Sequence, residues 1–203
     1  MTKRLSAQDW IDFALTTLAH DGFDALKADV LARKLGVSRG SFYWHFTDLG
    51  AFHTQVIERW KQRTTEAIIA DIERFQPGEE RLDALLRHAF GRGAALEIRM
   101  RGWAGNNAEA ARAVSGIDRR RQEYIELLLV EAGVALPLAV TRARLLYWTY
   151  LGAALSGTRL TGEELSQMVT ELKLIGLGEL PRSCRSANQD SSSSQPALRS
   201  HPD

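Results

Sequence analysis

One stretch decides the fold of the N-terminal part of this chain: Leu35-Gly36-Val37-Ser38-Arg39-Gly40-Ser41-Phe42-Tyr43-Trp44-His45-Phe46. Gly36 permits the left-handed backbone of a tight turn, and Ser38 is a suitable N-cap for a following helix. Phe42 and Phe46 stand at i and i+4, so they share one face of that helix. The stretch therefore predicts a turn and a short helix that buries two phenylalanines and exposes the side chains between them.

Two amphipathic helices are predicted before this turn. Apolar residues recur at i, i+3, i+4 and i+7 from Ile11 to Leu18, and again from Ala28 to Leu35. Ser6 is the expected N-cap of the first helix, and Gly22 its expected end. Together with the third helix they form a compact unit over residues 1–47, whose second and third helices meet the packing requirements of a helix-turn-helix.

The exposed face of the third helix is suited to DNA. Hydroxyl, imidazole and guanidinium groups can donate to phosphates, an arginine can read guanine in the major groove, and aromatic rings can contact thymine methyl groups. A lysine before the second helix can meet a phosphate across the groove. The candidate DNA-binding residues are Lys27, Ser38, Arg39, Gly40, Ser41, Tyr43, Trp44 and His45.

This region resembles the TetR/AcrR family of transcriptional regulators. The resemblance rests on the runs Leu31–Ser38 and Ser41–Phe46, whose Tyr-x-His-Phe ending is its most specific part, and extends weakly through Glu97–Ala104 and Arg142–Tyr147. It implies a homodimer joined by a four-helix interface, a ligand-binding domain and, commonly, repression. Where the family usually has a lysine just after the third helix, this chain has Leu49, which implies one phosphate contact fewer.

The rest of the chain is predicted to be helical, so the expected fold class is all-α. Helices are expected over residues 48–75, 79–90, 94–104, 108–132, 138–155 and 161–175, with turns at the Gly, Pro and Asn clusters between them. Residues 48–180 are expected to form one larger effector-binding and dimerisation domain. Residues 181–203 are rich in serine, contain the lone Cys184, and are expected to be disordered.

The larger domain is expected to enclose a pocket for a small hydrophobic or aromatic effector, because apolar and aromatic walls suit such ligands. The pocket candidates, each of which can equally be an ordinary core residue, are Trp60, Phe90, Met100, Trp103, Tyr124 and Tyr147. Candidate polar contacts are Arg99, Arg101, Asn106 and Asn107. The helix over 138–155 is more apolar than one buried face requires, which indicates a dimer interface at Leu145, Trp148, Leu151 and Leu155.

Composition excludes several other classes. The net charge of +1 means that any basic DNA-binding surface must be local. The five histidines lack metal-ligand spacing, and neither a Gly-x-Ser-x-Gly motif nor a phosphate-binding loop is present, so we expect no enzyme, metal or cofactor. The longest uncharged run, Leu145 to Thr158, is too short to cross a bilayer, and no signal peptide is evident, so we expect a cytoplasmic protein.

The sequence thus predicts a ligand-responsive transcriptional regulator, most simply a repressor. It would bind a palindromic operator as a homodimer and be released by a small-molecule effector. The alternative is a helical protein-interaction module of the same fold that does not bind DNA. Leu49, the nearby Asp29 and the nearly neutral net charge favour this alternative.

Overall fold

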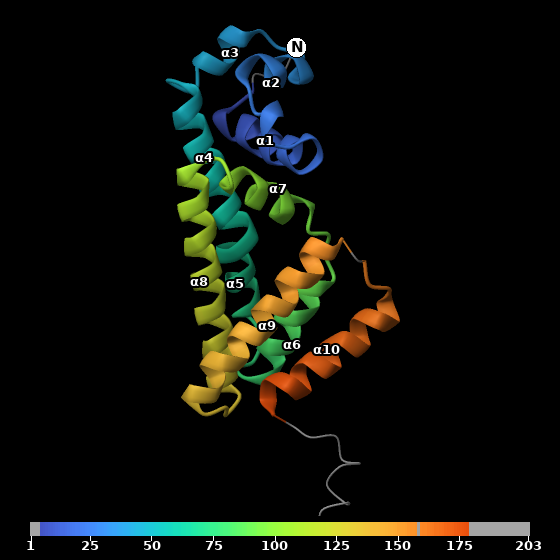
Figure 1. The fold of residues 1–203 in the computed structure, drawn as a ribbon. Helices are drawn as coiled ribbons and strands as arrows, with labels where there is room; N and C mark the ends of the chain where they lie inside the picture. The colour runs from blue at the N-terminus through green and yellow to red at the C-terminus, as the bar shows by residue number, and fades with distance from the viewer. Residues whose placement is uncertain (1–4, 158, 179–203) are drawn as a thin grey trace, which may run out of the picture.

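A computed structural model describes residues 5–157 and 159–178, and all regular structure within these ranges is helical (Figure 1). The predicted all-α class is therefore confirmed. The predicted disordered segment 181–203, including Cys184, lies outside the described residues. The helices are α1 (Ala7–Asp21), the 3₁₀ turn η1 (Phe23–Ala25), α2 (Ala28–Leu35), α3 (Arg39–Tyr43), α4 (Leu49–Lys61), the π-helical turn η2 (Gln62–Glu66), α5 (Ala67–Ile72), α6 (Glu79–Phe90), α7 (Ala95–Ala104), α8 (Ala108–Glu131), α9 (Leu136–Ser156) and α10 (Gly162–Leu177).

The N-terminal helices α1, α2 and α3 gather at one end of the molecule, and α9 and α10 lie toward the other (Figure 1). The run from α4 to α5 and the long helix α8 connect the two ends side by side. Helix α7 packs on α1 and so supports the N-terminal unit from below. This arrangement gives a continuous helical path from the N-terminal unit into the larger half.

Local signals set the ends of the N-terminal helices as predicted. The Ser6 hydroxyl accepts the Asp9 amide at 3.2 Å while the Asp9 carboxylate accepts the Ser6 amide at 2.8 Å, which forms a capping box at the start of α1. Gly36 has φ 67° and ψ 30°, the left-handed conformation that the turn between α2 and α3 requires. Ser38 occupies the N-cap position of α3, although its side chain makes no capping hydrogen bond.

The first hydrophobic core is centred on Phe42. Its ring is fully buried and meets Trp10 edge-on, with the two ring centroids 5.5 Å apart. Phe46 and Phe52 also contact it, each at a centroid distance of 5.0 Å. The same cluster continues into α7 and α8 through Met100, Trp103, Ala110, Val114 and Ile117. The N-terminal unit therefore shares its core with the larger half.

The long helix predicted over 48–75 is interrupted. The Ala67 amide donates to the carbonyl of Gln62 five residues back, so the segment between α4 and α5 is a π-helical turn. The extra residue in this turn brings Thr65 into the interior, where it is 2% exposed. The interruption places the polar side chains of Thr64 and Thr65 on the inward face of the long helix.

A second core holds the C-terminal helices together. It is formed by α6, the C-terminal end of α8, α9 and α10, with Leu82, Leu129, Leu146, Tyr147 and Val169 among its most buried members. Helix α9 begins at Leu136, slightly earlier than predicted, because Pro137 is well tolerated in a first helical turn. Thr161 and Glu164 form a capping box that opens α10. None of the described helices has the length and apolar character needed to cross a membrane.

Candidate functional site

The tip of the N-terminal unit presents a polar and aromatic surface. Phe42 anchors α3 from inside, which turns its neighbours Tyr43 and Trp44 outward with 47% and 72% of their side chains exposed. A guanidinium nitrogen of Arg39 donates to the Tyr43 hydroxyl at 3.1 Å, and the guanidinium carbon lies 5.5 Å from the centroid of the Tyr43 ring. The two side chains therefore form one preorganised pair on the outer face of α3.

The other candidate DNA-binding residues surround this pair. Lys27, Ser38 and Gly40 are exposed, whereas Ser41 and His45 are half-buried. Asp29, which would repel DNA, lies 3.9 Å from the Arg33 guanidinium on the same helix. Leu49 is half-buried against the first core and lies at the start of α4, behind the N-cap Asp48.

The larger half contains a cavity of about 490 Å³ between η2, α5, α6, α8 and α9. Its walls are predominantly apolar and include the aromatic rings of Phe90, Tyr124, Tyr147 and Tyr150. Residues of α1, namely Leu15, Thr16, Ala19 and His20, also line it. The cavity therefore touches the N-terminal unit directly, as well as the helices that carry most of its wall.

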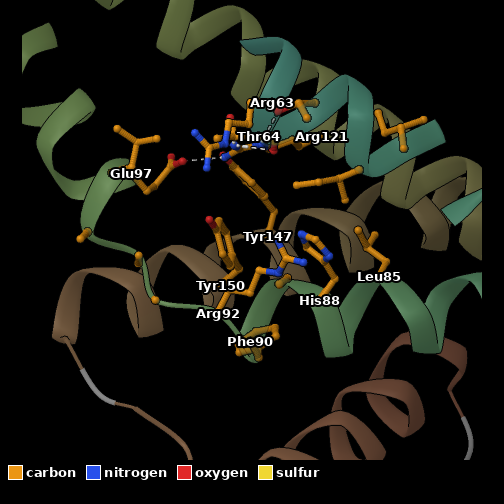
Figure 2. Close-up of a pocket in the computed structure, with 18 of the residues that line it drawn as sticks. Arg63, Thr64, Leu85, His88, Phe90, Arg92, Glu97, Arg121, Tyr147 and Tyr150 are labelled. Carbon is orange, nitrogen blue, oxygen red and sulfur yellow. Dashed lines mark hydrogen bonds and ion pairs between the residues drawn. The ribbon is translucent and has the colours of Figure 1, made fainter. Parts of the chain in front are cut away.

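A buried ion-pair network forms the polar side of the cavity (Figure 2). Glu97 of α7 is 5% exposed and receives a hydrogen bond from Arg101 at 2.9 Å and one from Arg121 at 3.1 Å. Arg121 also donates to the backbone carbonyl of Thr64 at 3.2 Å and to the Thr65 hydroxyl at 3.0 Å. A single guanidinium from α8 thus joins α7 to the π-helical turn.

Burial and neighbouring charges shift the pKa values of several groups in and around this network. Burial opposes the charge of Arg121, yet Glu97 holds the Arg121 pKa above its ordinary value. Burial and a 2.6 Å hydrogen bond to Asp118 raise the pKa of Tyr147, so its phenol stays protonated. Burial likewise raises the pKa of Tyr124 to about 12. On the opposite wall, burial and then the neighbouring Arg92 lower the pKa of His88, which favours a neutral imidazole.

The predicted pocket residues divide into two groups. Phe90, Tyr124 and Tyr147 line the cavity as expected from the sequence. Trp60, Met100 and Trp103 do not, because they are buried in the first core between the N-terminal unit and α7. Trp103, for example, stacks on Phe23 with ring centroids 4.6 Å apart. Aromatic character alone could not distinguish a wall of the cavity from this interdomain packing.

The four candidate polar contacts also lie away from the cavity lining. Asn107 caps α8 by accepting the Ala110 amide at 2.9 Å, and Arg101 lies behind the wall, where it pairs with Glu97 and Asp118. Arg99 and Asn106 do not line the cavity either. The charged residues that do line it are Arg63, Arg92, Glu97 and Arg121, with the histidines His20 and His88. Within the described ranges, no group of three or more His, Cys, Asp or Glu side chains is placed to hold a metal ion.

The outer face of α9 carries the candidate interface residues. Leu145, Trp148 and Leu155 are 46%, 60% and 58% exposed, at a spacing that keeps them on one face of the helix. Leu151 is half-buried and packs in part on the second core of its own chain. Three large apolar side chains therefore stand on a face that no described helix of this chain covers.

Comparisons with known proteins agree with this architecture. Residues 11–48 match the family model described as bacterial regulatory proteins, tetR family. No curated protein matches the sequence significantly.

Solved structures share the fold across most of the chain. One is a transcriptional regulator from Saccharomonospora viridis in complex with choline, at 16% identity and a TM-score of 0.63, which covers 82% of this chain and 92% of that one. Another is assigned to the TetR family, from Rhodococcus sp., at 17% identity and a TM-score of 0.61, covering 86% and 99%. A third is the transcriptional regulator FadR from Bacillus subtilis in complex with stearoyl-CoA, at 15% identity and a TM-score of 0.60, covering 87% and 100%.

At these identities the solved structures establish the fold, and the family model covers residues 11–48. The N-terminal unit is thus similar to the tetR family of bacterial regulatory proteins over those residues, and the described chain shares its fold with solved structures described as TetR-family transcriptional regulators.

Proposed function

We propose that this chain is a ligand-responsive transcriptional repressor that binds a palindromic DNA operator as a homodimer and leaves it when a small molecule fills the cavity. The proposal rests on one observation: the cavity is lined both by α1 of the N-terminal unit and by helices of the larger half. Leu15, Ala19 and His20 of α1 line it together with residues of α5, α6 and α8. A ligand there would touch the DNA-binding unit itself, so its binding energy could depend on how that unit is oriented.

The outward face of α3 supports DNA binding. Tyr43 and Trp44 are 47% and 72% exposed, and Arg39 pairs with Tyr43 on the outer face of α3, as a helix entering a major groove requires. The nearly neutral net charge of the chain does not oppose this, because Arg39 and Lys27 supply positive charge locally. Binding of DNA would also place the protein in the cytoplasm of a bacterium.

A dimer follows from the limited reach of one such unit. A single helix-turn-helix contacts too few bases for tight specific binding, so two units on successive turns of the duplex are expected. The exposed Leu145, Trp148 and Leu155 on α9 provide an apolar face that a second copy can cover. With both copies placed by one symmetry axis, the operator would be palindromic.

The coupling path is a mechanical one. Asp12 of α1 accepts hydrogen bonds from Arg59 of α4 at 2.8 and 3.3 Å, which fixes the N-terminal unit to the long helix. That helix continues through η2, where Thr64 and Thr65 meet Arg121 on the wall of the cavity. A ligand that displaces this wall would shift α4 and α1 together and change the spacing of the two α3 helices in the dimer.

Neighbours of the same fold hold different ligands, choline in one structure and stearoyl-CoA in another. A ligand-binding role for the cavity of this chain is consistent with both. The alternative, a protein-interaction module without DNA binding, is an outcome of the experiment below.

The experiment selects operators from a random duplex library with the purified full-length chain, then measures affinity by fluorescence anisotropy. We expect a palindromic site, salt-dependent affinity, and a loss of about tenfold or more for Tyr43→Ala. Arg74→Ala is the matched control, because Arg74 is an exposed cation at the far end of α5 whose guanidinium lies 3.3 Å from the Asp71 carboxylate. A folded wild-type protein that selects no sequence and shows no salt-dependent binding would support the interaction module instead.

A further inference from the structure

We infer that the cavity binds an acidic amphiphile, a carboxylic acid with an apolar body, whose carboxylate lies between Arg92 and His88. This inference rests on the proposed function for its regulatory meaning and specifies the class of effector. It depends on how the charges of the cavity wall are distributed.

The cavity wall carries more positive than negative groups. Arg63, Arg92 and Arg121 line it, and Glu97 is the only carboxylate among its lining residues. His20 and His88 line it as well, and an imidazole N–H can donate a hydrogen bond to an anion. An apolar cavity with this excess of cationic side chains attracts an anion and repels a cation.

The single carboxylate is already neutralised. Glu97 accepts hydrogen bonds from both Arg101 and Arg121 and is 5% exposed, so a cationic ligand could pair with it only by breaking a buried ion pair. The aromatic wall is also partly occupied, because the Arg121 guanidinium carbon lies 6.0 Å from the centroid of the Tyr150 ring. The two features that would hold a quaternary ammonium group are thus committed to the protein itself.

Arg92 is the cation of the wall that lacks a carboxylate partner, and the imidazole of His88 lies beside it. Arg121 pairs with Glu97. Arg63 makes no hydrogen bond or ion pair among the described residues, but its charge acts on the carboxylate of Asp12 of α1. Among the described residues, Arg92 makes no hydrogen bond or ion pair, and its charge acts instead on His88. Figure 2 shows the two side chains next to each other, with Phe90 and Tyr150 beside them. One carboxylate placed between them would satisfy a guanidinium and an imidazole together.

The rest of the cavity suits the apolar body of such a ligand. Beyond His88 the wall passes over Leu85 and Leu86 of α6, Ile68 and Ile69 on the long helix, and Ile125 of α8. Burial of an alkyl or aryl group against these side chains supplies the affinity, at roughly 25 cal/mol per Å² of apolar surface. The carboxylate then sets the orientation.

The test uses three probes of equal chain length: dodecanoate, its methyl ester and dodecyltrimethylammonium, each below its micelle concentration. Isothermal titration calorimetry of the full-length protein measures their affinities. We expect dodecanoate to bind at least about tenfold more tightly than the ester and the ammonium probe, as one charge-assisted pair provides. Equal or tighter binding of either other probe would overturn the inference, as would failure of all three to bind.

Variants locate the head group. Arg92→Gln and His88→Ala should each weaken dodecanoate by about tenfold and leave the ester unchanged. Arg87→Gln is the matched control. Arg87 precedes His88 on α6, pairs with Asp83 at 2.6 Å and does not line the cavity. Equal losses for the acid and the ester would assign Arg92 and His88 to wall structure and overturn the inference.

Operator affinity separates this inference from the proposed function. If dodecanoate binds as expected but leaves DNA affinity unchanged, the ligand class stands and the regulatory proposal fails. If the ammonium probe releases DNA and the acid does not, the regulatory proposal stands and the ligand class is overturned.

Discussion

The Arg121 guanidinium donates to the backbone carbonyl of Thr64 across 3.2 Å, from α8 to the π-helical turn of the neighbouring long helix. In a regular α-helix a carbonyl is engaged by the amide four residues later, so a side-chain donor must share it. The π-helical turn alters this register and presents Thr64 to α8. The cavity wall and the helix that leads to the DNA-binding unit are therefore joined by one side chain, which also holds the buried Glu97.

Removing Arg121 should destabilise the fold by leaving a buried carboxylate short of a partner. We expect Arg121→Met to lower the free energy of unfolding by about 3 kcal/mol, the magnitude typical of a broken buried ion pair. The double variant Arg121→Met with Glu97→Gln should recover part of this loss, because the unpaired charge is gone. Urea unfolding followed by circular dichroism measures both. A double variant as unstable as the single one would show that packing, and not charge, dominates at this site.

Phe42 on α3 and Trp44 at its C-cap should have separate effects on stability and on operator binding. Phe42 is fully buried at the centre of the first core, whereas Trp44 is 72% exposed. We expect Phe42→Ala to lower the free energy of unfolding by about 3–5 kcal/mol. Trp44→Ala should change it by less than about 1 kcal/mol but weaken operator binding. Thermal denaturation and fluorescence anisotropy on both variants test this, and a strongly destabilised Trp44→Ala would contradict the placement.

Much of the fold follows from local sequence signals. The capping boxes at Ser6 and Thr161 and the left-handed Gly36 are set by residues within a few positions, so their chemistry can be read directly. The π-helical turn could not be predicted in this way. Its effect is visible only in the folded chain, as a shift in the phase of burial: after Trp60 the next buried position is Thr65 rather than 63 or 64.

The lining of the cavity was less predictable than the exposure of the side chains on α3. Trp60 and Trp103 are at least as large as Tyr147, yet of the three only Tyr147 lines the cavity. The packing of the N-terminal unit on α7 buries both tryptophans in the first core instead. Arg121 and Glu97 were missed because each is one of many charged residues on amphipathic helices. The two residues are 24 positions apart in the sequence and come together only in the folded chain.

The exposed stripe on α9 should mediate dimerisation. We expect Leu145→Glu to shift the protein from dimer to monomer at micromolar concentration, because a buried unpaired carboxylate opposes assembly. Leu127→Glu is the matched control, since Leu127 is 47% exposed on α8 and Leu145 is 46% exposed. Sedimentation velocity measures both variants. A Leu145→Glu protein that remains dimeric would place the interface elsewhere.

Acidification should weaken the contact between the N-terminal unit and the larger half through His53. The His53 ring meets Phe23 and Trp103 edge-on, at centroid distances of 5.2 and 5.3 Å, and its Nε2 is 2.9 Å from the Leu26 carbonyl oxygen. Burial lowers the pKa of His53 below the ordinary histidine value of 6.5, despite opposing effects of the Leu26 carbonyl and Glu109. The folded state therefore binds this proton less readily than the unfolded state.

The sign of the pH dependence follows from that lowered pKa. Above pH 6.5 His53 is neutral in both states and costs no stability. As the pH falls below 6.5, the unfolded chain takes up the proton first, and the free energy of unfolding decreases until the folded-state pKa is passed. His88, whose pKa burial and Arg92 also lower, contributes in the same direction.

Urea unfolding at intervals between pH 7 and pH 5 measures this dependence. Asp12 and Asp83 stay ionised in the folded state over this range, because their pKa values lie below 3.8. We expect His53→Gln to reduce the slope, and His53→Gln with His88→Gln to reduce it further, because glutamine is polar but does not titrate. The amide of glutamine can still donate to the Leu26 carbonyl, so the variant should fold at neutral pH. A slope unchanged in the double variant would mean that neither imidazole is protonated more readily on unfolding.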